Sequence, residues 1–358
     1  MIVQVGPYPP PHGGISVYIK RMKEYLDLMK IDNEVWNVSS RRTFFSEKST
    51  NIRNINLKYV PLYYLFSNET KIIHYSISGK KTKYFIGVFN RTIFRKRRKI
   101  LTIHGDCVYL YNNNDKIMTR CLNSFDVIIC VKHGDKEFLE NKGITSEIFE
   151  IPAYINPIEK EQDRKNIPRE VWSFIDKSKF VITANGCIRF YKEKDLYGID
   201  MLIDLVYRLK KRNMDVNLLI ALLGVEDQTK EEKSYYKELK DRISNLDLKD
   251  KVFIFEVKGT EFYPILQKSN LFIRPTNTDG DAVSLREALH FKAPSIASDV
   301  VVRPEGTILF QNRNKCDLEI KVVDVLKNYD YYKKIAGEIK IKDYAVDVSN
   351  IYEKLLCR

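Results

Sequence analysis

Apolar residues occur along the chain in runs of about three to eight, and polar or amphipathic stretches separate these runs. Runs of this length indicate buried strands rather than helices. Strands of a parallel sheet are covered on both faces, so they read as continuous apolar runs. The pattern predicts strands at residues 1–5, 34–38, 71–74, 99–104, 127–131, 148–151, 180–184, 216–223, 251–255, 271–274, 295–297 and 307–310.

Amphipathic segments between these runs predict helices. Ile19, Met22 and Leu26 recur at helical spacing after the first run, and residues 201–209 have the same period. Strands that alternate with helices are typical of an α/β fold with parallel, doubly wound sheets. The periodicity fades near residues 154–178, where prolines and mixed charges appear, so we expect a connection between two such halves there.

Length and composition limit the class of protein. A chain of 358 residues favours about two domains, and no apolar run approaches the ~18–20 residues of a membrane span. The chain starts directly with a strand-like run, so we expect no signal peptide and a cytoplasmic protein. The six cysteines show no CxxC pair and no zinc-like spacing, which predicts reduced thiols and no structural metal.

Positive charge is concentrated in the first half of the chain. Residues 1–150 hold 24 Lys or Arg and 14 Asp or Glu, and residues 80–99 hold nine basic residues, no acidic one and several aromatic ones. Such a segment suits an anionic membrane surface, where each cation adds about 1 kcal/mol. A solvated helix face is the alternative. Nucleic acid binding is disfavoured because no recognisable motif accompanies the charge.

The stretch 271–310 has the most informative pattern. A strand at 271–274 leads into a polar loop at 276–281, a helix at 282–291 and another strand at 295–297. A helix that begins on such a loop presents unpaired N–H groups and about half a positive charge. Phosphate is a natural ligand for that helix end.

The residues of this loop fit an anionic ligand. Gly280 and Ala282 are small, so the backbone amides from Gly280 through Asp281 to Val283 could approach a diphosphate closely. Glu287 lies on the first turns of the helix, where its carboxylate could bind ribose hydroxyls. The simpler alternative is that Glu287 only complements the helix dipole.

Two segments of this stretch resemble the nucleotide-sugar-binding signature of retaining GT-B glycosyltransferases, the large bacterial polysaccharide-biosynthesis family (glycosyl transferases group 1). Residues 279–288 read DGDAVSLREA and residues 293–299 read APSIASD. They match the family's acid, Gly-containing loop, second acid eight positions on, and Pro-centred strand. The family usually has Glu where this chain has Asp279, so a shorter carboxylate would have to reach the donor sugar.

The resemblance implies two Rossmann-like domains that face each other across a cleft. Residues 1–160 would bind the acceptor, and residues 161–340 would bind the nucleotide sugar. Residues 341–358 would form a terminal helix that returns to the first domain.

The resemblance also implies further donor-binding residues. Asn185 and Gly186 follow the first strand of the second half, and Arg189 matches the cation that neutralises the donor diphosphate. Lys194 keeps the family's spacing to a second cation, and Lys192 remains the alternative. An exposed surface cation is the simpler interpretation for each.

In the first half, His12, Gly13 and Gly14 resemble the family's first Gly-rich loop, which lines the cleft and here would contact the acceptor. His104 ends a predicted strand and matches a His-Gly position that contacts the donor sugar. From the residues alone, a tight turn and a structural histidine would be the safer interpretations.

The resemblance predicts a retaining transfer of a sugar from a nucleotide diphosphate sugar to a saccharide acceptor, expected to be lipid-linked, in bacterial surface polysaccharide biosynthesis. The catalytic residues would be His104, Asp279, Arg189 and Lys194. No metal or other cofactor is expected, because these cations and the loop amides would stabilise the leaving diphosphate. The protein would associate peripherally with the inner face of the cell membrane.

Three alternatives remain. Residues 279–281 also spell Asp-x-Asp, which chelates Mn²⁺ in another glycosyltransferase architecture. A nucleotide-sugar epimerase of the same fold would consume the donor without an acceptor. An inactive relative could serve as a membrane-bound scaffold, a role for which the shorter acid at Asp279 gives some support.

Overall fold

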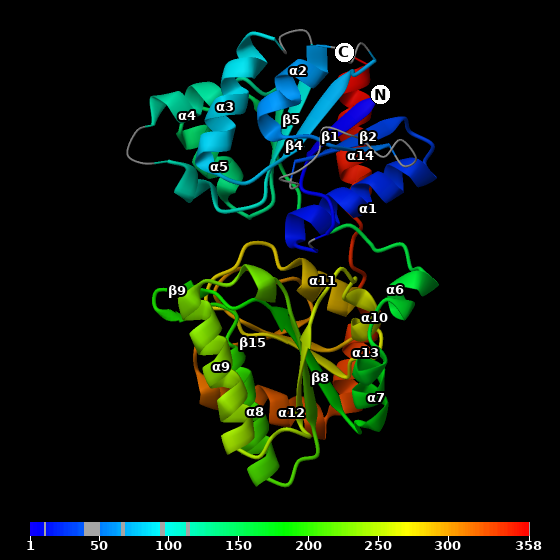
Figure 1. The fold of residues 1–358 in the computed structure, drawn as a ribbon, viewed down its shortest axis with the longest axis vertical. Coiled ribbons are helices and arrows are strands. Elements are labelled where there is room, and N and C mark those ends of the chain that lie inside the picture. The colour runs from blue at the N-terminus through cyan, green and yellow to red at the C-terminus, as the bar shows by residue number, and fades with distance from the viewer. Residues whose placement is uncertain (11, 39–50, 66–68, 94–96, 112–114, 358) are drawn as a thin grey trace. The chain divides into compact units, whose positions relative to one another are not determined.

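The computed structural model describes residues 1–10, 12–38, 51–65, 69–93, 97–111 and 115–357. The chain divides into two compact units, drawn in Figure 1. Unit 1 comprises residues 1–158 and 343–358, and unit 2 comprises residues 159–342. Each unit is an α/β fold built on a parallel sheet, which confirms the predicted fold class.

Unit 1 contains, in its described residues, a sheet of order β3-β2-β1-β4-β5-β6-β7 in which all neighbours pair in parallel. Its strands are β1 (Ile2–Gly6), β2 (Asn33–Asn37), β3 (Ile52–Asn54), β4 (Ile72–Ser76), β5 (Arg98–Ile103), β6 (Val127–Cys130) and β7 (Glu147–Glu150). Its helices are α1 (Gly14–Leu28), α2 (Val60–Leu65), α3 (Lys80–Arg91), α4 (Lys116–Leu122), α5 (Asp135–Asn141) and α14 (Ala345–Leu356), with short 3₁₀ turns η1 (Leu57–Tyr59) and η2 (Cys107–Leu110).

The two faces of the first sheet are covered by different helices because strand side chains alternate. Val3, Val5 and Tyr75 point into a core that also contains buried residues of α2, α3, α4 and α5. The opposite face is covered by α1 and α14, which pack on each other and on β1, β2 and β4 (Figure 1). The last helix of the chain is therefore part of the unit that contains the first strand.

Unit 2 contains, among its described residues, a parallel sheet of order β12-β11-β8-β13-β14-β15. Its strands are β8 (Val181–Gly186), β11 (Asn217–Leu222), β12 (Val252–Glu256), β13 (Leu271–Arg274), β14 (Ser295–Ser298) and β15 (Thr307–Phe310). Its helices are α6 (Glu161–Lys165), α7 (Arg169–Lys177), α8 (Ile199–Lys211), α9 (Lys230–Asn245), α10 (Tyr263–Leu266), α11 (Val283–His290), α12 (Lys315–Lys327) and α13 (Tyr329–Glu338), with a 3₁₀ turn η3 (Val225–Asp227). A small antiparallel hairpin joins β9 (Phe190–Tyr191) to β10 (Lys194–Asp195).

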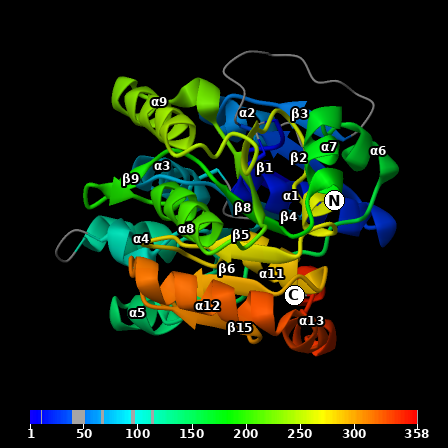
Figure 2. The same cartoon turned by 90° about the horizontal axis from the view of Figure 1, so that it is seen from below.

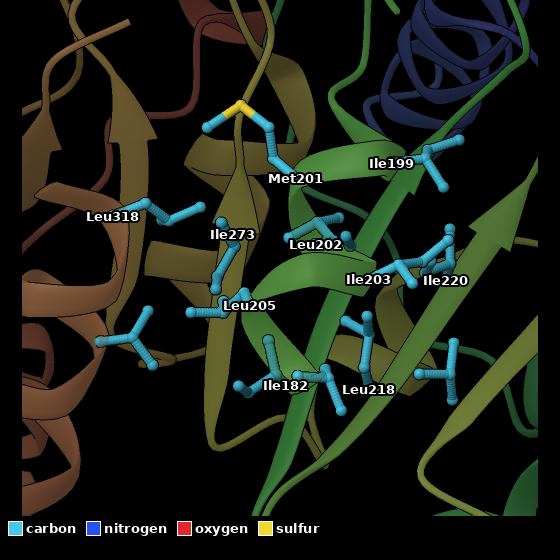
Figure 3. Packing of buried hydrophobic residues seen from close by; sticks show 14 of the residues in the cluster. Ile182, Ile199, Met201, Leu202, Ile203, Leu205, Leu218, Ile220, Ile273 and Leu318 are labelled. Atoms are coloured by element: carbon cyan, nitrogen blue, oxygen red, sulfur yellow. The ribbon is translucent and has the colours of Figure 1, made fainter. Parts of the chain in front are cut away.

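The second sheet is also buried on both faces. Leu218 and Ile220 belong to a core shared with α8, α9 and α12, whereas Leu219 and Ala221, at the alternate positions, pack with α7. Figure 2 shows α8 and α12 as neighbours, and Figure 3 shows Leu205 of α8 beside Ile273 of β13 within this core. Burial of both faces explains the continuous apolar runs in the sequence.

The order of strands fixes where a ligand can bind in each unit. The order in which successive strands are added to the sheet reverses between the parallel neighbours β1 and β4 in unit 1, and between β8 and β13 in unit 2. Ligands of doubly wound sheets bind outside the carboxyl ends of the strands at such a switch point. Residues that bind a ligand should therefore lie at these two places.

Candidate functional site

The donor-binding residues predicted in unit 2 lie at or just beyond the carboxyl ends of the strands of its sheet. β8 ends at Gly186, β13 ends at Arg274 and β14 ends at Ser298, and parallel strands present these ends together. The helix α11 begins after the β13 loop with Ala282 as its N-cap, and the side chain of Ala282 makes no capping hydrogen bond. Its N-terminal amides therefore face the switch point without the oxygen ligand that a Ser or Asp cap would supply.

The carboxylate of Asp279, in the loop after β13, is bound by two arginines, Arg274 and Arg303. Its Oδ2 accepts hydrogen bonds from Arg274 Nε at 2.9 Å, Arg303 Nη1 at 2.8 Å and Thr276 Oγ1 at 3.1 Å. Its Oδ1 accepts from Arg274 Nη2 at 3.1 Å and from the Gly280 amide at 3.1 Å. Burial alone would raise the pKa of Asp279, but the two guanidinium groups lower it well below the ordinary value. Asp279 is therefore ionised at any physiological pH.

Arg274 connects three elements of the switch point. In addition to Asp279, its Nη1 donates to Asn185 Oδ1 of β8 and to Ser284 Oγ of α11, each at 3.3 Å. Its guanidinium lies 5.3 Å from the centre of the Tyr197 ring. The predicted donor residue Asn185 and the predicted sugar-binding residue Asp279 thus meet on the same guanidinium.

Arg303 is the more deeply buried of the two arginines. Its side chain is 2% exposed, and burial lowers its pKa below the ordinary value. Its Nε donates to the Ser298 carbonyl at 2.9 Å, and its Nη2 donates to Ser298 Oγ and Thr276 Oγ1 at 3.1 Å. These contacts attach the loop after β14 to the loop after β13.

The other acidic positions of the stretch have different surroundings. Asp281 Oδ1 accepts from Arg286 Nε at 2.7 Å, so the two carboxylates of the Asp-x-Asp sequence are held by different arginines. Glu287 lies in α11 and is 4% exposed. Val283 begins the helix, and its amide donates to the Asp281 carbonyl at 2.9 Å.

The two predicted phosphate cations differ in their environment. Arg189 Nη1 lies 2.5 Å from Glu232 Oε1, and the arginine side chain remains 44% exposed. Lys194 is exposed on the β9–β10 hairpin and forms no ion pair within the described part of the chain. Lys192 and Glu193 form the hairpin turn with φ of 49° and 59°, the left-handed geometry of a type I′ turn.

A buried carboxylate that the sequence did not indicate organises the segment behind this hairpin. Asp195 accepts hydrogen bonds from the amides of Tyr197, Gly198 and Asp200 at 3.0, 3.1 and 3.3 Å, at the start of α8. Burial, and then the charge on Asp200, raises the pKa of Asp195 to about 6. The ring of Tyr197 packs so closely on Gly186 that a Cβ there would meet ring atoms at 2.6 Å. Gly186 is therefore required by packing.

His104 lies just beyond β5, near the switch point of unit 1. Its ring packs edge-on against Tyr18 with a centroid distance of 4.9 Å. Its Nε2 is buried and has no hydrogen-bond partner among the described residues. Burial, and then the charge of Lys83, lowers the pKa of His104 to about 3, so the ring is neutral at pH 7. Burial likewise lowers the pKa of Lys83 to about 8, and its Nζ donates to the Ile77 carbonyl at 3.2 Å.

The loop at His12, Gly13 and Gly14 leads into α1. The Gly13 amide donates to Ser16 Oγ at 2.8 Å, and Ser16 Oγ donates back to the Gly13 carbonyl at 3.0 Å. A Cβ on Gly14 would meet no atom within 4 Å, whereas a Cβ on Gly6 would collide with neighbouring atoms. Packing requires a glycine at position 6 but not at position 14. His12 is half-buried beside this open turn.

Residues 171–340 match the family model for glycosyl transferases group 1. This segment is therefore similar in sequence to a group 1 glycosyltransferase domain. No curated protein matches the chain in sequence.

Solved structures of glycosyltransferases share the fold of the whole chain. Sucrose-phosphate synthase from Thermosynechococcus elongatus aligns with a TM-score of 0.71 and 12% identity over 100% of this chain and 99% of that chain. HepE from Anabaena in complex with UDP aligns with a TM-score of 0.68 and 14% identity over 100% of both chains. A glycosyltransferase from Rickettsia africae aligns with a TM-score of 0.68 and 17% identity over 99% of this chain and 98% of that one. The chain has the GT-B fold.

The basic segment outside the glycosyltransferase domain is only partly exposed. Lys80 pairs with Asp115 at 2.7 Å. Arg98 and Lys99 each lie 3.7 Å from Asp126. Exposed positions of α3 are Lys81, Val88 and Arg91, and residues 94–96 of the segment lie outside the described residues. Within the part of the chain that the structure describes, no helix is long and apolar enough to span a membrane.

Arg274 and Arg303 are the residues of the glycosyltransferase domain that the sequence interpretation missed. A signal was present at Arg274, because a charged residue ends an otherwise apolar strand that is buried on both faces. Arg303 gave no such signal, since it follows Asp279 by 24 positions and meets it only through the fold.

Proposed function

We propose that the protein is a retaining glycosyltransferase that moves a sugar from a nucleotide diphosphate sugar to a hydroxyl of a saccharide acceptor. The observation that carries this proposal is the switch point of unit 2, where the start of α11 lies beside the buried Arg274 and Arg303 in a segment that matches the group 1 family. The named neighbours support the substrate class, since HepE was solved with UDP and with UDP-glucose.

Charge stabilisation of the leaving group is the chemistry we assign to unit 2. The nucleoside diphosphate leaves with an extra negative charge, which Arg189, Lys194 and amides of the loop that leads into α11 would stabilise. Fixed donors of this kind are each worth roughly 3–4 kcal/mol in comparable sites. Glu287 would bind the ribose. Arg189 is already ordered by Glu232, so it would reach the phosphate without losing much rotational freedom.

His104 would act in the first unit as a neutral hydrogen-bonding group. Because its pKa lies near 3, it offers a sugar hydroxyl a hydrogen bond rather than a charge. The Nε2 atom, which has no hydrogen-bond partner in the described part of the chain, is the atom that would make this contact. The open turn at His12, Gly13 and Gly14 would receive the acceptor.

We propose that the transfer needs no metal or other cofactor. The carboxylates of Asp279 and Asp281 are bound by separate arginines, which supports a metal-free site rather than a Mn²⁺ ion that both carboxylates would chelate. The test is turnover in excess EDTA with and without added Mn²⁺. Unchanged turnover supports the proposal, and loss of activity that Mn²⁺ restores would favour the Asp-x-Asp alternative.

We further propose a lipid-linked acceptor and peripheral binding to the inner face of the cell membrane. Support comes from the exposed Lys81, Val88 and Arg91 of α3. Flotation with vesicles of anionic lipid should recover the protein, whereas purely zwitterionic vesicles should not. Lys81→Glu with Arg91→Glu should abolish flotation, and Lys258→Glu, an exposed lysine of unit 2, serves as the matched control. Equal flotation of all variants would reject membrane binding through α3.

The decisive experiment is a donor screen by thermal shift, followed by product analysis. A panel of UDP-, GDP- and ADP-sugars should contain at least one compound that raises the melting temperature, and that donor should be consumed only when a saccharide acceptor is added. The product linkage should keep the anomeric configuration of the donor. Consumption without acceptor would favour an epimerase, and binding without any turnover would favour the inactive scaffold.

A further inference from the structure

Asp279 has no hydrogen-bonding capacity left for a substrate. An ionised carboxylate offers about four lone-pair sites. The carboxylate of Asp279 already accepts five hydrogen bonds from Arg274, Thr276, Gly280 and Arg303. A sugar hydroxyl could bind it only by displacing one of these donors.

The cluster of Arg274, Asp279 and Arg303 contains one more cation than anion. It contains two guanidinium groups and one carboxylate, and the side chains of Arg274, Asp279 and Arg303 are 12%, 9% and 2% exposed. The neighbouring carboxylate of Asp281 is engaged by Arg286. Burying a net charge is unfavourable unless an opposite charge accompanies it, so this cluster favours an anionic ligand.

One hydrogen-bond donor of Arg274 remains unused in the described residues. A guanidinium has five N–H groups, and four of those on Arg274 donate to Asp279, Asn185 and Ser284. The remaining N–H is on Nη2. This nitrogen and the Gly280 amide nitrogen each lie 3.1 Å from the same Asp279 oxygen, so the free N–H is next to the loop amides that precede α11.

We propose that Arg274 is the buried cation that binds an anionic group of the donor, and that Asp279 and Arg303 position it. The proposal rests on the proposed function and assigns Asp279 a positioning role instead of a sugar contact. The anionic group is the diphosphate or, in an acidic sugar, a carboxylate. The start of α11 beside this loop favours the diphosphate, because the amides that lead into a helix and a guanidinium together match its oxygens.

The assignment gives Arg274 a role in the reaction. As the bond between the sugar C1 and the diphosphate oxygen breaks, its electron pair stays on that oxygen, beside the guanidinium. The acceptor oxygen forms the new bond to C1 and its proton passes to the departing phosphate. A guanidinium fixed by four hydrogen bonds to Asp279, Asn185 and Ser284 needs no rearrangement as this charge develops.

The test compares ligands that differ only in their anionic groups. Isothermal titration of the full chain would use a nucleoside, its diphosphate, the matching neutral nucleotide sugar and a nucleotide hexuronate. Arg274→Gln should weaken diphosphate binding about 10- to 100-fold and leave nucleoside binding unchanged. Arg274→Lys keeps the charge and should recover part of the loss. Arg313→Gln, which removes another arginine–carboxylate pair of unit 2, is the matched control and should bind all four ligands normally.

The Asp279→Asn variant separates positioning from sugar contact. If Asp279 positions Arg274, this variant should weaken the diphosphate and the neutral nucleotide sugar by the same factor and should lower kcat more than it raises KM. A loss that appears only with the nucleotide sugar would show that Asp279 contacts the sugar, and it would overturn the inference.

Other outcomes identify the anion that Arg274 binds, or show whether the inference alone or the proposed function is wrong. An Arg274→Gln loss confined to the nucleotide hexuronate would assign the cation to a sugar carboxylate. Equal binding of every ligand by wild type and Arg274→Gln would reject the inference while leaving the proposed function intact. Wild-type protein that binds no nucleotide in the panel would reject the proposed function itself. If Arg274→Gln fails to fold, Arg274→Lys carries the same comparison.

Discussion

Two buried histidines make the stability of unit 1 depend on pH. His74 Nδ1 lies 2.5 Å from Tyr352 Oη, and its Nε2 lies 2.6 Å from Thr102 Oγ1. Burial, and then the charge of His104, lowers the pKa of His74 to about 3, and the pKa of His104 is also lowered to about 3. The unfolded chain binds a proton at each histidine below about pH 6.5 while the folded unit does not, so stability must fall as the medium is acidified.

We therefore expect the free energy of unfolding of unit 1 to decrease between pH 7 and pH 5. Each histidine can contribute up to about 1.4 kcal/mol per pH unit once the pH is below 6.5. Urea unfolding of a Trp172→Phe variant would measure this, because Trp36 is then the remaining tryptophan and is buried in unit 1. His74→Gln and His104→Gln should each flatten the dependence, and an unchanged slope in both would contradict the assignment.

The candidate site shows what a residue pattern can and cannot indicate. The sequence pattern predicted the loop at 276–281 and the helix start after it, because turn-forming residues give way to helix-forming residues at a definite position. The partners of Asp279 could not be predicted from the sequence. Arg274 and Arg303 lie five and 24 positions from Asp279, and whether they reach it depends on where β13 and β14 end in the fold. The functional roles of Asp279, Arg189 and Lys194 remain predictions.

At the scale of elements, strands with continuous apolar runs were predictable and those without were not. Each predicted run corresponds to a strand of one of the two sheets. The apolar pattern did not predict β3, because Ile52–Asn54 has a single apolar residue and is a strand only by pairing with β2. It also missed the β9–β10 hairpin, whose left-handed turn is made by Lys192 and Glu193 instead of the usual Asn-Gly.

The start of α1 provides a prediction at this scale. Gly14 is the first residue of the helix and has open space around its Cβ position, and alanine is the better helix former by about 1 kcal/mol. Gly14→Ala should therefore leave thermal stability unchanged or slightly raised. If a ligand approaches this backbone, the same variant should lower kcat/KM for the acceptor several-fold.

A matched control is available within the same unit. Gly6→Ala would place a Cβ against Ile19 and the Ser76 carbonyl, so it should lower the melting temperature clearly. Thermal unfolding and initial rates on both variants distinguish a functional glycine from a structural one. A Gly14→Ala enzyme that is as stable and as active as wild type, with every acceptor tested, would remove the loop from the site.

At the scale of the whole chain, the two units differ in how they are assembled from the sequence. Unit 2 is one continuous segment, whereas unit 1 is completed by the last residues of the chain. The helix α14 buries Val348, Ile351, Tyr352 and Leu355 on the first sheet and α1. Tyr352 also makes the hydrogen bond to His74. The structure thus ties the stability of the first unit to its distant C-terminal helix.

Removing residues 343–358 should consequently affect the two units very differently. Burial of each large apolar side chain is worth roughly 1.5–3 kcal/mol, so losing four of them removes a sum comparable with the ~5–15 kcal/mol stability of a domain. We expect the chain 1–342 to lose the cooperative unfolding of unit 1, reported by Trp36, while unit 2 keeps its own transition and any thermal shift by a nucleoside diphosphate. Tyr352→Phe, which deletes only the hydroxyl, should lower the stability of unit 1 by about 1–3 kcal/mol. A truncated chain in which Trp36 reports the wild-type transition would show that α14 only covers unit 1 and does not complete its core.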